Sequence, residues 1–435
     1  MKTKSILLFL TLSLFGLAPG NLQAQQSLSL SLDEARQYAL EHNRTLTNTQ
    51  FEVEKSQWAV LESIAAGLPQ ASAQLDYQSF MGAEMLIRFG EGMPEQYIPL
   101  RPQSNMNITL SQLVFNGNYF VGIQAARIAQ DMAATNRQKS KLEVETQVVD
   151  AYNLVLITQE LLRVLEKNVD NLEDLFKKTA ALGEVGIIEQ TDVDQLEIQL
   201  NSLKNAVNQT QRQKELAMNM LKMQLGIDPS DEVIPTNTLD EVLATMDLDY
   251  LLMTDLQLRQ NFDYQLMLKQ EELSKKMINM QYANALPTIS AFYQHTVKII
   301  RPDFDMVPNN AIGFSVSIPI FSSGQRYSQV KQASIDFQTT QNNRRLLEDQ
   351  LKIQEKQLKF NFSNAYEAFI NQKKNIEVSE RVNKNIRIKY EQGMVSGLDL
   401  INADNNYLRA VNEYISSIME MLNASTQLKK LYGQI

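Results

Sequence analysis

The sequence predicts a mainly α-helical fold with a membrane β-barrel portion, built from two copies of one structural unit. Glycines recur with the same spacings of 69 and 40 residues in both copies: Gly117, Gly186 and Gly226, then Gly324, Gly393 and Gly433. The second set follows the first by 207 residues. Short alternating segments precede each set, and each begins at a Leu-Pro pair. Because an internal repeat of this size assigns the same elements to both halves, it determines the architecture.

The first 24 residues have the pattern of a secretory signal peptide. Lys2 and Lys4 precede an apolar run from Ile6 to Leu17, and Leu22-Gln23-Ala24 resembles a cleavage site. Without these two lysines the mature chain carries 39 Lys and Arg against 50 Asp and Glu, a formal net charge of −11. This acidic balance argues against a nucleic-acid partner. The chain contains no cysteine, which excludes disulfides and thiolate chemistry.

The first structural repeat is expected over residues 25–226. It comprises a helix from about Ser31 to Ala66, a strand pair at 70–80 and 104–115, a long helix at 118–182 and a return helix at 188–225. In the strands, apolar Ala71, Ala73 and Leu75 alternate with polar neighbours. Alternation over about ten residues is typical of strands with lipid on one face and water on the other. A half-buried sheet in a soluble protein is the alternative.

Residues 227–254 break the helical rhythm with Asp228-Pro229 and Pro235, and we expect a partly structured connector there. The second structural repeat follows over 255–435. It comprises a helix from about Asp255 to Ala283, a strand pair at 288–300 and 311–320, a long helix at 325–391 and a return helix at 397–432. The loops at 81–102 and 301–308, rich in Pro, Gly and charge, would face the exterior.

Both long helices carry an apolar residue at about every seventh position. The first has Val148, Val155, Leu162, Val169 and Phe176; the second has Phe362, Phe369, Ile376 and Tyr390, with Asn383 interrupting the series. A seven-residue repeat keeps one seam facing a partner helix and produces a left-handed supercoil. We therefore predict long antiparallel coiled-coil hairpins. The small residues between 125 and 134 also allow close packing on further faces.

Two glycine turns reverse these hairpins, at Gly183–Gly186 and Gly393–Gly397. Glycine supplies the positive φ angles that tight reversals require. Asp192 and Asp399 each follow the middle glycine by six positions, and we expect Thr191 and Ser396 to cap the return helices. The acidic side chains would at least stabilise the helix N-termini.

Four strands per chain do not close a transmembrane barrel, which needs about eight or more. An open sheet in lipid would leave its edges unpaired, at several kcal/mol per group. If the strands lie in a membrane, several chains must therefore share one barrel.

The signal peptide, duplicated strand pairs and paired long and short helices together resemble the TolC-like outer-membrane efflux proteins. The most specific matches are Gly186…Thr191-Asp192 and Tyr390-x-x-Gly393…Asp399-Leu400, with Leu225-Gly226 and Tyr432-Gly433 closing the copies. The resemblance covers residues 25 to 435 and implies a homotrimer with a shared 12-stranded barrel in outer-membrane lipid. It also implies a trimeric periplasmic α-barrel that docks onto an adaptor protein and an inner-membrane pump or secretion ATPase.

The resemblance also implies roles for residues near the turns. Tyr390 falls on the aromatic position of the lock that closes the family's periplasmic tip, and Asp192 on its acidic partner. Val395 occupies the position of a lock arginine, so that part of the lock is missing. Asp399 matches the first acidic position of the pore constriction, which selects cations. Asn402 occupies the second, leaving one carboxylate per chain instead of two.

Adaptor docking would use the turns themselves. The expected docking residues share exposure at the loop tips: Gly183, Val185, Gly186, Ile187, Gly393, Met394, Val395 and Gly397. Apolar side chains on loop tips are typical of a partner surface. They could instead cap the interior of the hairpins.

We expect no enzymatic activity, cofactor or metal. The only two histidines, His42 and His295, have no neighbouring ligand motif, and no phosphate-binding loop or nucleophile elbow occurs. The leading interpretation is a passive trimeric exit duct for small toxic compounds or proteins. The alternative is a non-conducting periplasmic coiled-coil scaffold or tether, which would not require four lipid-facing strands.

Overall fold

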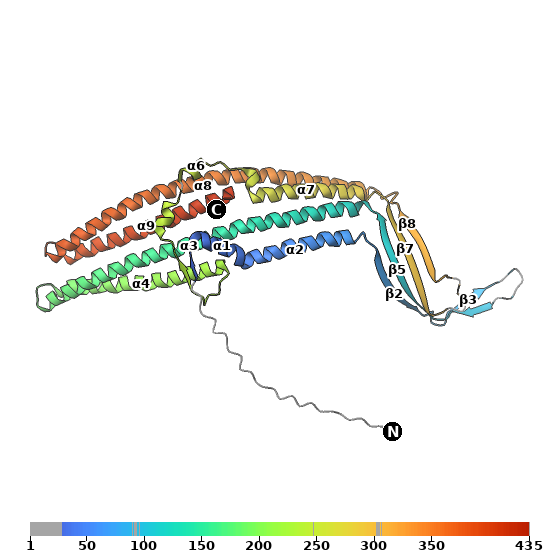
Figure 1. Cartoon of the computed structure of the whole chain (residues 1–435), viewed down its shortest axis with the longest axis horizontal. Coiled ribbons are helices and arrows are strands. Elements are labelled where there is room, and N and C mark those ends of the chain that lie inside the picture. The colour runs from blue at the N-terminus through green and yellow to red at the C-terminus, as the bar shows by residue number, and fades with distance from the viewer. Residues whose placement is uncertain are drawn as a thin grey trace, which may run out of the picture.

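The computed structural model describes residues 28–434, except residues 89, 91–93, 95, 247, 302–304 and 306. The expected signal peptide lies outside the described residues. Long helices run side by side into a sheet at one end of the elongated molecule, and two helical hairpins turn at the other end (Figure 1). The expected mainly helical architecture with two repeats is confirmed.

The helices are α1 (Leu32–His42), α2 (Arg44–Ala65), α3 (Gly117–Glu184), α4 (Gln190–Leu225), α5 (Leu239–Ala244), α6 (Leu248–Met253), α7 (Phe262–Ala283), α8 (Gln325–Glu391) and α9 (Gly397–Tyr432). The long helices α3 and α8 contain 68 and 67 residues. At 1.5 Å per residue, each is about 100 Å long. They pair with α4 and α9 in two antiparallel hairpins (Figure 1). Within the described residues, no helix is long and apolar enough to cross a membrane.

The single helix expected from Ser31 to Ala66 is wrong, because Asn43 divides it into α1 and α2. The Asn43 Oδ1 atom accepts the backbone N–H groups of Thr45 and Leu46, at 2.8 and 3.3 Å. This side chain satisfies N–H groups that a helix start leaves free, so the chain changes direction there. The second repeat has the same break, where the 3-10 helix η1 (Leu258–Gln260) ends and Asn261 caps α7.

The seven-residue pattern identifies the packed seam of the hairpins. Val148, Val155 and Phe362 are completely buried, in a core that extends around the middle of the molecule. A second core, which includes Leu172, Leu196 and Leu400, lies closer to the hairpin turns. Burial of apolar surface at about 25 cal/mol per Å² is the main force that holds α3 and α8 to their partners.

The connector wraps the middle of the molecule. Strand β1 (Leu28–Leu30) pairs in parallel with β6 (Val233–Pro235), and α5 contacts α3. Tyr152 of α3 is 1% exposed, and its hydroxyl donates to the Leu30 carbonyl at 3.0 Å. The start of the described chain is therefore held against the centre of α3 by a buried hydrogen bond.

One four-stranded antiparallel sheet has the order β2 (Gln70–Gln78), β5 (Gln103–Phe115), β7 (Thr288–Ile300) and β8 (Asn310–Ser317). Strand β8 ends three residues before the expected position 320, because Pro319 has no N–H for a ladder bond. The expected loop at 81–102 also contains a small hairpin, β3 (Glu84–Ile87) with β4 (Gln96–Pro99).

The register of the sheet aligns apolar side chains across the strands on one face and polar side chains on the other. Leu110 of β5 lies opposite Ala71 and Tyr293, and Tyr293 lies opposite Ile312. On the other face, Asn107 accepts hydrogen bonds from Gln294 and Thr296, at 3.1 and 2.8 Å. One face is thus apolar and the other carries a polar network. Strands β2 and β8 form the two edges of this sheet.

The helices next to the sheet form a row in the order α2, α3, α7 and α8, with contacts between each successive pair (Figure 1). The Trp58 side chain on α2 is 70% exposed in the single chain. Helix α2 packs mainly on α3, with a smaller contact to α1.

Candidate functional site

The candidate site is the hairpin end, where α3 turns into α4 and α8 turns into α9. Both turns have the same hydrogen bonds. The Ile187 N–H donates to the Leu182 carbonyl and the Met394 N–H to the Lys389 carbonyl, each at 2.9 Å. Gly186 and Gly393 have φ angles of 76° and 71°, in the left-handed region that glycine favours.

The other two turn glycines were expected to supply positive φ as well, and this is wrong because both lie inside helices. Gly183 allows α4 to approach α3 closely, since a Cβ atom placed there would lie 2.9 Å from Val193 Cγ2. Gly397 does the same for the contact between the two hairpins. A Cβ atom placed on Gly397 would lie 3.1 Å from Asp192 Oδ1.

Asp192 therefore joins the two turns. It belongs to the first turn of α4, and its carboxylate lies against the first residue of α9. The unpaired N–H groups at a helix N-terminus give that end a partial positive charge, which attracts a carboxylate. The contact connects the first repeat to the second in the described chain.

Thr191 and Ser396 behave differently at the helix starts. Ser396 forms a capping box with Asp399: the Asp399 N–H donates to Ser396 Oγ at 3.2 Å, and Asp399 Oδ2 accepts from Ser396 N at 3.0 Å. The expected cap by Thr191 is wrong, because α4 begins at Gln190 and Glu189 occupies the cap position. The Thr191 hydroxyl instead donates to Glu189 Oε2 at 3.3 Å.

Asp399 and Asn402 both have exposed side chains on α9. Hydrogen bonds from the Ser396 side chain and backbone lower the pKa of the Asp399 carboxyl. The Asp399 carboxylate is therefore charged and exposed at neutral pH.

Tyr390 packs against the second core, which includes Leu400. Its hydroxyl is buried and has no hydrogen-bond partner within the described residues. Tyr390 and Asp192, the two expected lock residues, thus share this end of the molecule, with no hydrogen bond between them. A buried hydroxyl without a partner costs about 1–3 kcal/mol, so a partner outside the single chain would be favourable.

The expected docking residues include strongly exposed apolar side chains. Ile187 is 70% exposed and Met394 is 68% exposed, and Val185 is similarly exposed. Val395 and Ile188 are half-buried against the turns. The exposed side chains of the two turns form an apolar surface at the hairpin end, which we call the tip surface: Val185, Ile187 and Met394.

Sequence reasoning missed two contacts between the hairpins. The Lys178 ammonium lies 3.4 Å from the Glu391 carboxylate, and Gln199 donates to Asn405 at 2.9 Å. These pairs link α3 to α8 and α4 to α9. Long exposed polar side chains occur throughout both helices, so no pattern in the sequence distinguishes them.

The histidines do not form a chemical site. His42 stacks on Tyr38 with ring centroids 4.0 Å apart, and His295 contacts the Asn310 side chain at 2.7 Å. Within the described residues, no group of three or more potential ligands could hold a metal ion.

Comparison with known families identifies the chain. The family model described as "Outer membrane efflux protein" matches residues 35–226 and 255–434, which are the two repeats. The chain belongs to this family. As a TolC-like outer membrane efflux protein, it is an outer-membrane transport protein with a large periplasmic part. Family and fold are those of channel proteins.

Solved structures with the same fold are outer membrane channels. The CmeC channel of Campylobacter jejuni has a TM-score of 0.73 and 16% identity, over 92% of this chain and 85% of CmeC. VceC of Vibrio cholerae has a TM-score of 0.69 and 14% identity, over 93% and 96% of the two chains. The open state of MtrE from Neisseria gonorrhoeae has a TM-score of 0.72 and 16% identity, over 93% and 89%. No curated protein matches this efflux protein in sequence.

Proposed function

We propose that three copies of this efflux protein form a passive exit duct of a tripartite efflux or type I secretion system. The duct carries small toxic compounds or proteins from a periplasmic adaptor and an inner-membrane pump or secretion ATPase to the exterior. Outer membrane efflux proteins in general work as trimers with such partners. The observation that carries the proposal is the four-stranded sheet with an apolar face, a polar face and two free edges.

The sheet supports a shared barrel for a physical reason. In lipid, unpaired N–H and C=O groups on β2 and β8 would cost several kcal/mol each, and pairing β8 of one copy with β2 of the next removes both edges. Three copies supply 12 strands, within the range of closed membrane barrels. The apolar row through Leu110 and Tyr293 would face lipid, and the Asn107 network would face the water-filled interior.

At the periplasmic end, the tip would both select ions and dock the adaptor. Asp399 supplies one carboxylate per chain at the constriction, with Asn402 beside it as a neutral polar group. Tyr390 and Asp192 hold the tip closed, assisted by the ion pair between Lys178 and Glu391. The tip surface around Ile187 and Met394 buries its exposed apolar area against the adaptor.

Membrane extraction combined with mass measurement tests the proposal. We expect the mature protein to resist sodium carbonate, to dissolve only in detergent, and to have three times the chain mass in light scattering. Release by carbonate as a monomer would favour the periplasmic scaffold or tether, which has no barrel.

A further inference from the structure

Corresponding segments of the two repeats make the same contacts, which makes one half of the molecule a template for contacts of the other. Asn43 Nδ2 donates to the Gln224 carbonyl at 2.6 Å, and Asn261 Nδ2 donates to the Leu431 carbonyl at 3.3 Å. Asn261 follows Asn43 by 218 residues, and Leu431 follows Gln224 by 207. The offset is therefore 218 between α2 and α7, and 207 between the long hairpins.

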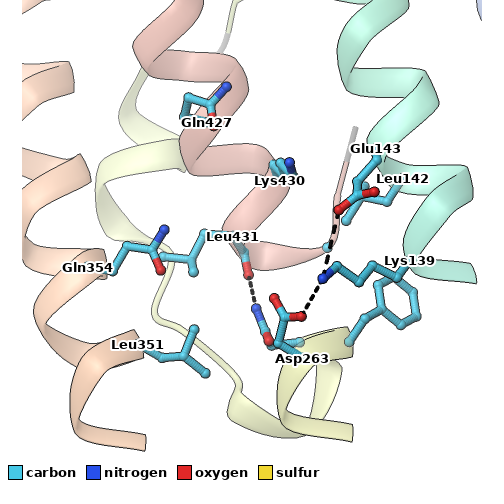
Figure 2. A pocket seen from close by; sticks show the side chains of 12 residues that line it. Lys139, Leu142, Glu143, Asp263, Leu351, Gln354, Gln427, Lys430 and Leu431 are labelled. Carbon is cyan, nitrogen blue, oxygen red and sulfur yellow. Dashed lines mark hydrogen bonds and ion pairs between the residues drawn. The ribbon is translucent and has the colours of Figure 1, made fainter. Parts of the chain in front are cut away.

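The contacts used as the template are those at the junction between the two repeats, where α3 packs against α7. Lys139 lies 2.6 Å from Asp263, and the two side chains point toward each other at the small cavity in Figure 2. Further along, Lys276 donates to Gln124 at 2.9 Å, and Lys269 lies 3.9 Å from Asp131.

The equivalents of these two helices, α8 and α2, lie at opposite edges of the helix row and do not meet in one chain (Figure 1). We infer that α8 of one copy packs against α2 of the next copy in the register of the α3–α7 junction. The inference rests on the proposed trimer and adds the residues that form its interface.

Shifting the template contacts by the two offsets gives the pairs across the interface. The Gln124–Lys276 contact becomes Lys331 with Trp58 of the next copy. The Asp131–Lys269 pair becomes Gln338 with Phe51, and the Lys139–Asp263 pair becomes Leu346 with Thr45. In each transferred pair one polar side chain is thus replaced by an aromatic or apolar one, a kind of side chain that releases more free energy on burial.

The exposed side chains of one copy fit this interface. Trp58 is 70% exposed and Phe51 is 58% exposed on the outer side of α2. The Lys331 ammonium already lies 5.8 Å from the centre of the Tyr327 ring. A tryptophan face is the strongest aromatic partner for a cation, so Lys331 would lie between Tyr327 and Trp58 of the next copy.

The glycines at the starts of α3 and α8 also differ in that one has a neighbour within the chain and the other does not. A Cβ atom placed on Gly117 would lie 2.8 Å from the Leu286 side chain, which packs there within the chain. At the equivalent Gly324, the described residues leave the corresponding space open. Its missing neighbour would be the equivalent of Leu286, Leu68 of the next copy, which is 54% exposed.

The same transfer gives the register between the strands of neighbouring copies. Gln70 lies opposite Ser111 and Thr288 opposite Ser317, so the offset from β5 to β8 is 206. It is one residue shorter than in the helices because seven positions separate Ser317 from Gly324, whereas six separate Ser111 from Gly117. Transfer of the β5–β7 register then places Val316 opposite Leu75 of the next copy, and Phe314 opposite Tyr77. Apolar residues meet on the lipid face, as a shared barrel requires.

Cysteine cross-linking tests the interface, because the natural chain has no cysteine. The test pair is Trp58→Cys with Lys331→Cys. One control is Lys276→Cys with Gln124→Cys, the template pair, which must cross-link within a chain. The other is Trp58→Cys with Arg345→Cys, 14 residues further along α8 and about 21 Å from the test position.

With a short bismaleimide, we expect covalent dimers and trimers from the test pair. We expect monomers with an internal link from the template pair, and no product from the displaced pair.

The outcomes separate the inference from the proposed function. A protein with trimer mass whose test pair does not cross-link would overturn the interface and leave the trimer standing. A monomer in detergent would overturn both. As a second measurement on the unmodified protein, Trp58 is the only tryptophan, so acrylamide quenching reports this site alone. We expect quenching several-fold weaker than for free tryptophan, and quenching equal to the free amino acid would contradict the inference.

Discussion

Asn383 donates its side-chain amide to the Asp404 carboxylate, and both residues are buried between α8 and α9. Arg387 completes the cluster at 3.5 Å from the same carboxylate oxygen. Asn383 interrupts the apolar seven-residue series of α8, and Asp404 lies opposite it on α9. A polar pair in an otherwise apolar seam fixes the alignment of two helices, because a shifted alignment would leave both groups buried without partners.

Removing Asp404 should destabilise the second hairpin. In Asp404→Ala, the Arg387 guanidinium and the Asn383 amide lose their acceptor, which should lower the free energy of unfolding by about 3 kcal/mol. The control Asp404→Asn keeps an acceptor oxygen and should lose less. Chemical denaturation followed by helical circular dichroism measures both, and an unchanged Asp404→Ala midpoint would show that the cluster has no stabilising role.

The asparagine caps should contribute similarly in both repeats. Asn43→Ala and Asn261→Ala each remove a helix cap and a hydrogen bond to a distant carbonyl, at a cost of about 1–2 kcal/mol. Asn→Asp at either position keeps the cap acceptor, loses the amide donor and adds a negative charge, which a helix N-terminus favours. Thermal melting should therefore rank the variants wild type, Asp, Ala. Equal melting temperatures for Asp and Ala would indicate that the cap acceptor contributes nothing.

Asp150 on α3 should make stability depend on pH. Burial raises the pKa of its carboxyl from 3.8 to about 6, and Thr426 and Lys430 offset this only partly. Because the folded state holds the proton more tightly, the contribution of Asp150 is most favourable below pH 3.8 and is lost as pH rises through about 6. Asp150→Asn should therefore be more stable than wild type at pH 7. The difference should shrink toward zero near pH 4, and a difference independent of pH would contradict this account.

Charge on the tip surface should prevent docking. Ile187→Asp or Met394→Asp would place a carboxylate in an apolar contact and should weaken adaptor binding by about tenfold or more, equivalent to about 1.4 kcal/mol. Met223→Asp is the matched control, since Met223 is 64% exposed near the other end of α4. Binding of a purified adaptor by surface plasmon resonance distinguishes them. Equal affinity of all three variants would place docking elsewhere.

Asp399 should give the channel its preference for cations. Asp399→Asn keeps an oxygen that can accept from the Ser396 cap and removes the charge, so the ratio of cation to anion permeability should fall several-fold. Ser396→Ala weakens the cap, retains the carboxylate and should preserve the preference. Reversal potentials across a salt gradient provide the ratio. A cation preference unchanged in Asp399→Asn would exclude the acidic ring.

Features that depend on local pattern could be predicted from the sequence. The glycine spacing indicated the two hairpins, and the alternation from Ala71 to Leu75 indicated a strand, because both express the geometry of the backbone itself. The break at Asn43 was missed, since the apolar pattern continues through it and only the cap geometry reveals it. Pro319 carried the signal for the early end of β8, because proline cannot continue a ladder.

The contacts at the hairpin end could not be predicted from the sequence. Ser396 and Thr191 both lie near the start of a return helix, yet only Ser396 caps its helix, because Ser396 directly precedes α9 whereas Thr191 is the second residue of α4. The contacts of Asp192 with Gly397, and of Lys178 with Glu391, join segments about two hundred residues apart. Such pairs depend on how the hairpins pack, which no local pattern encodes.

Single-channel recording of the purified mature protein in a planar bilayer tests most directly whether this efflux protein forms a channel. We predict discrete, cation-preferring current steps, which become larger or more frequent when the lock is weakened by Tyr390→Phe. Closure of the tip would explain silence in the wild type alone. Silence in both the wild type and Tyr390→Phe would contradict the channel and support the periplasmic scaffold.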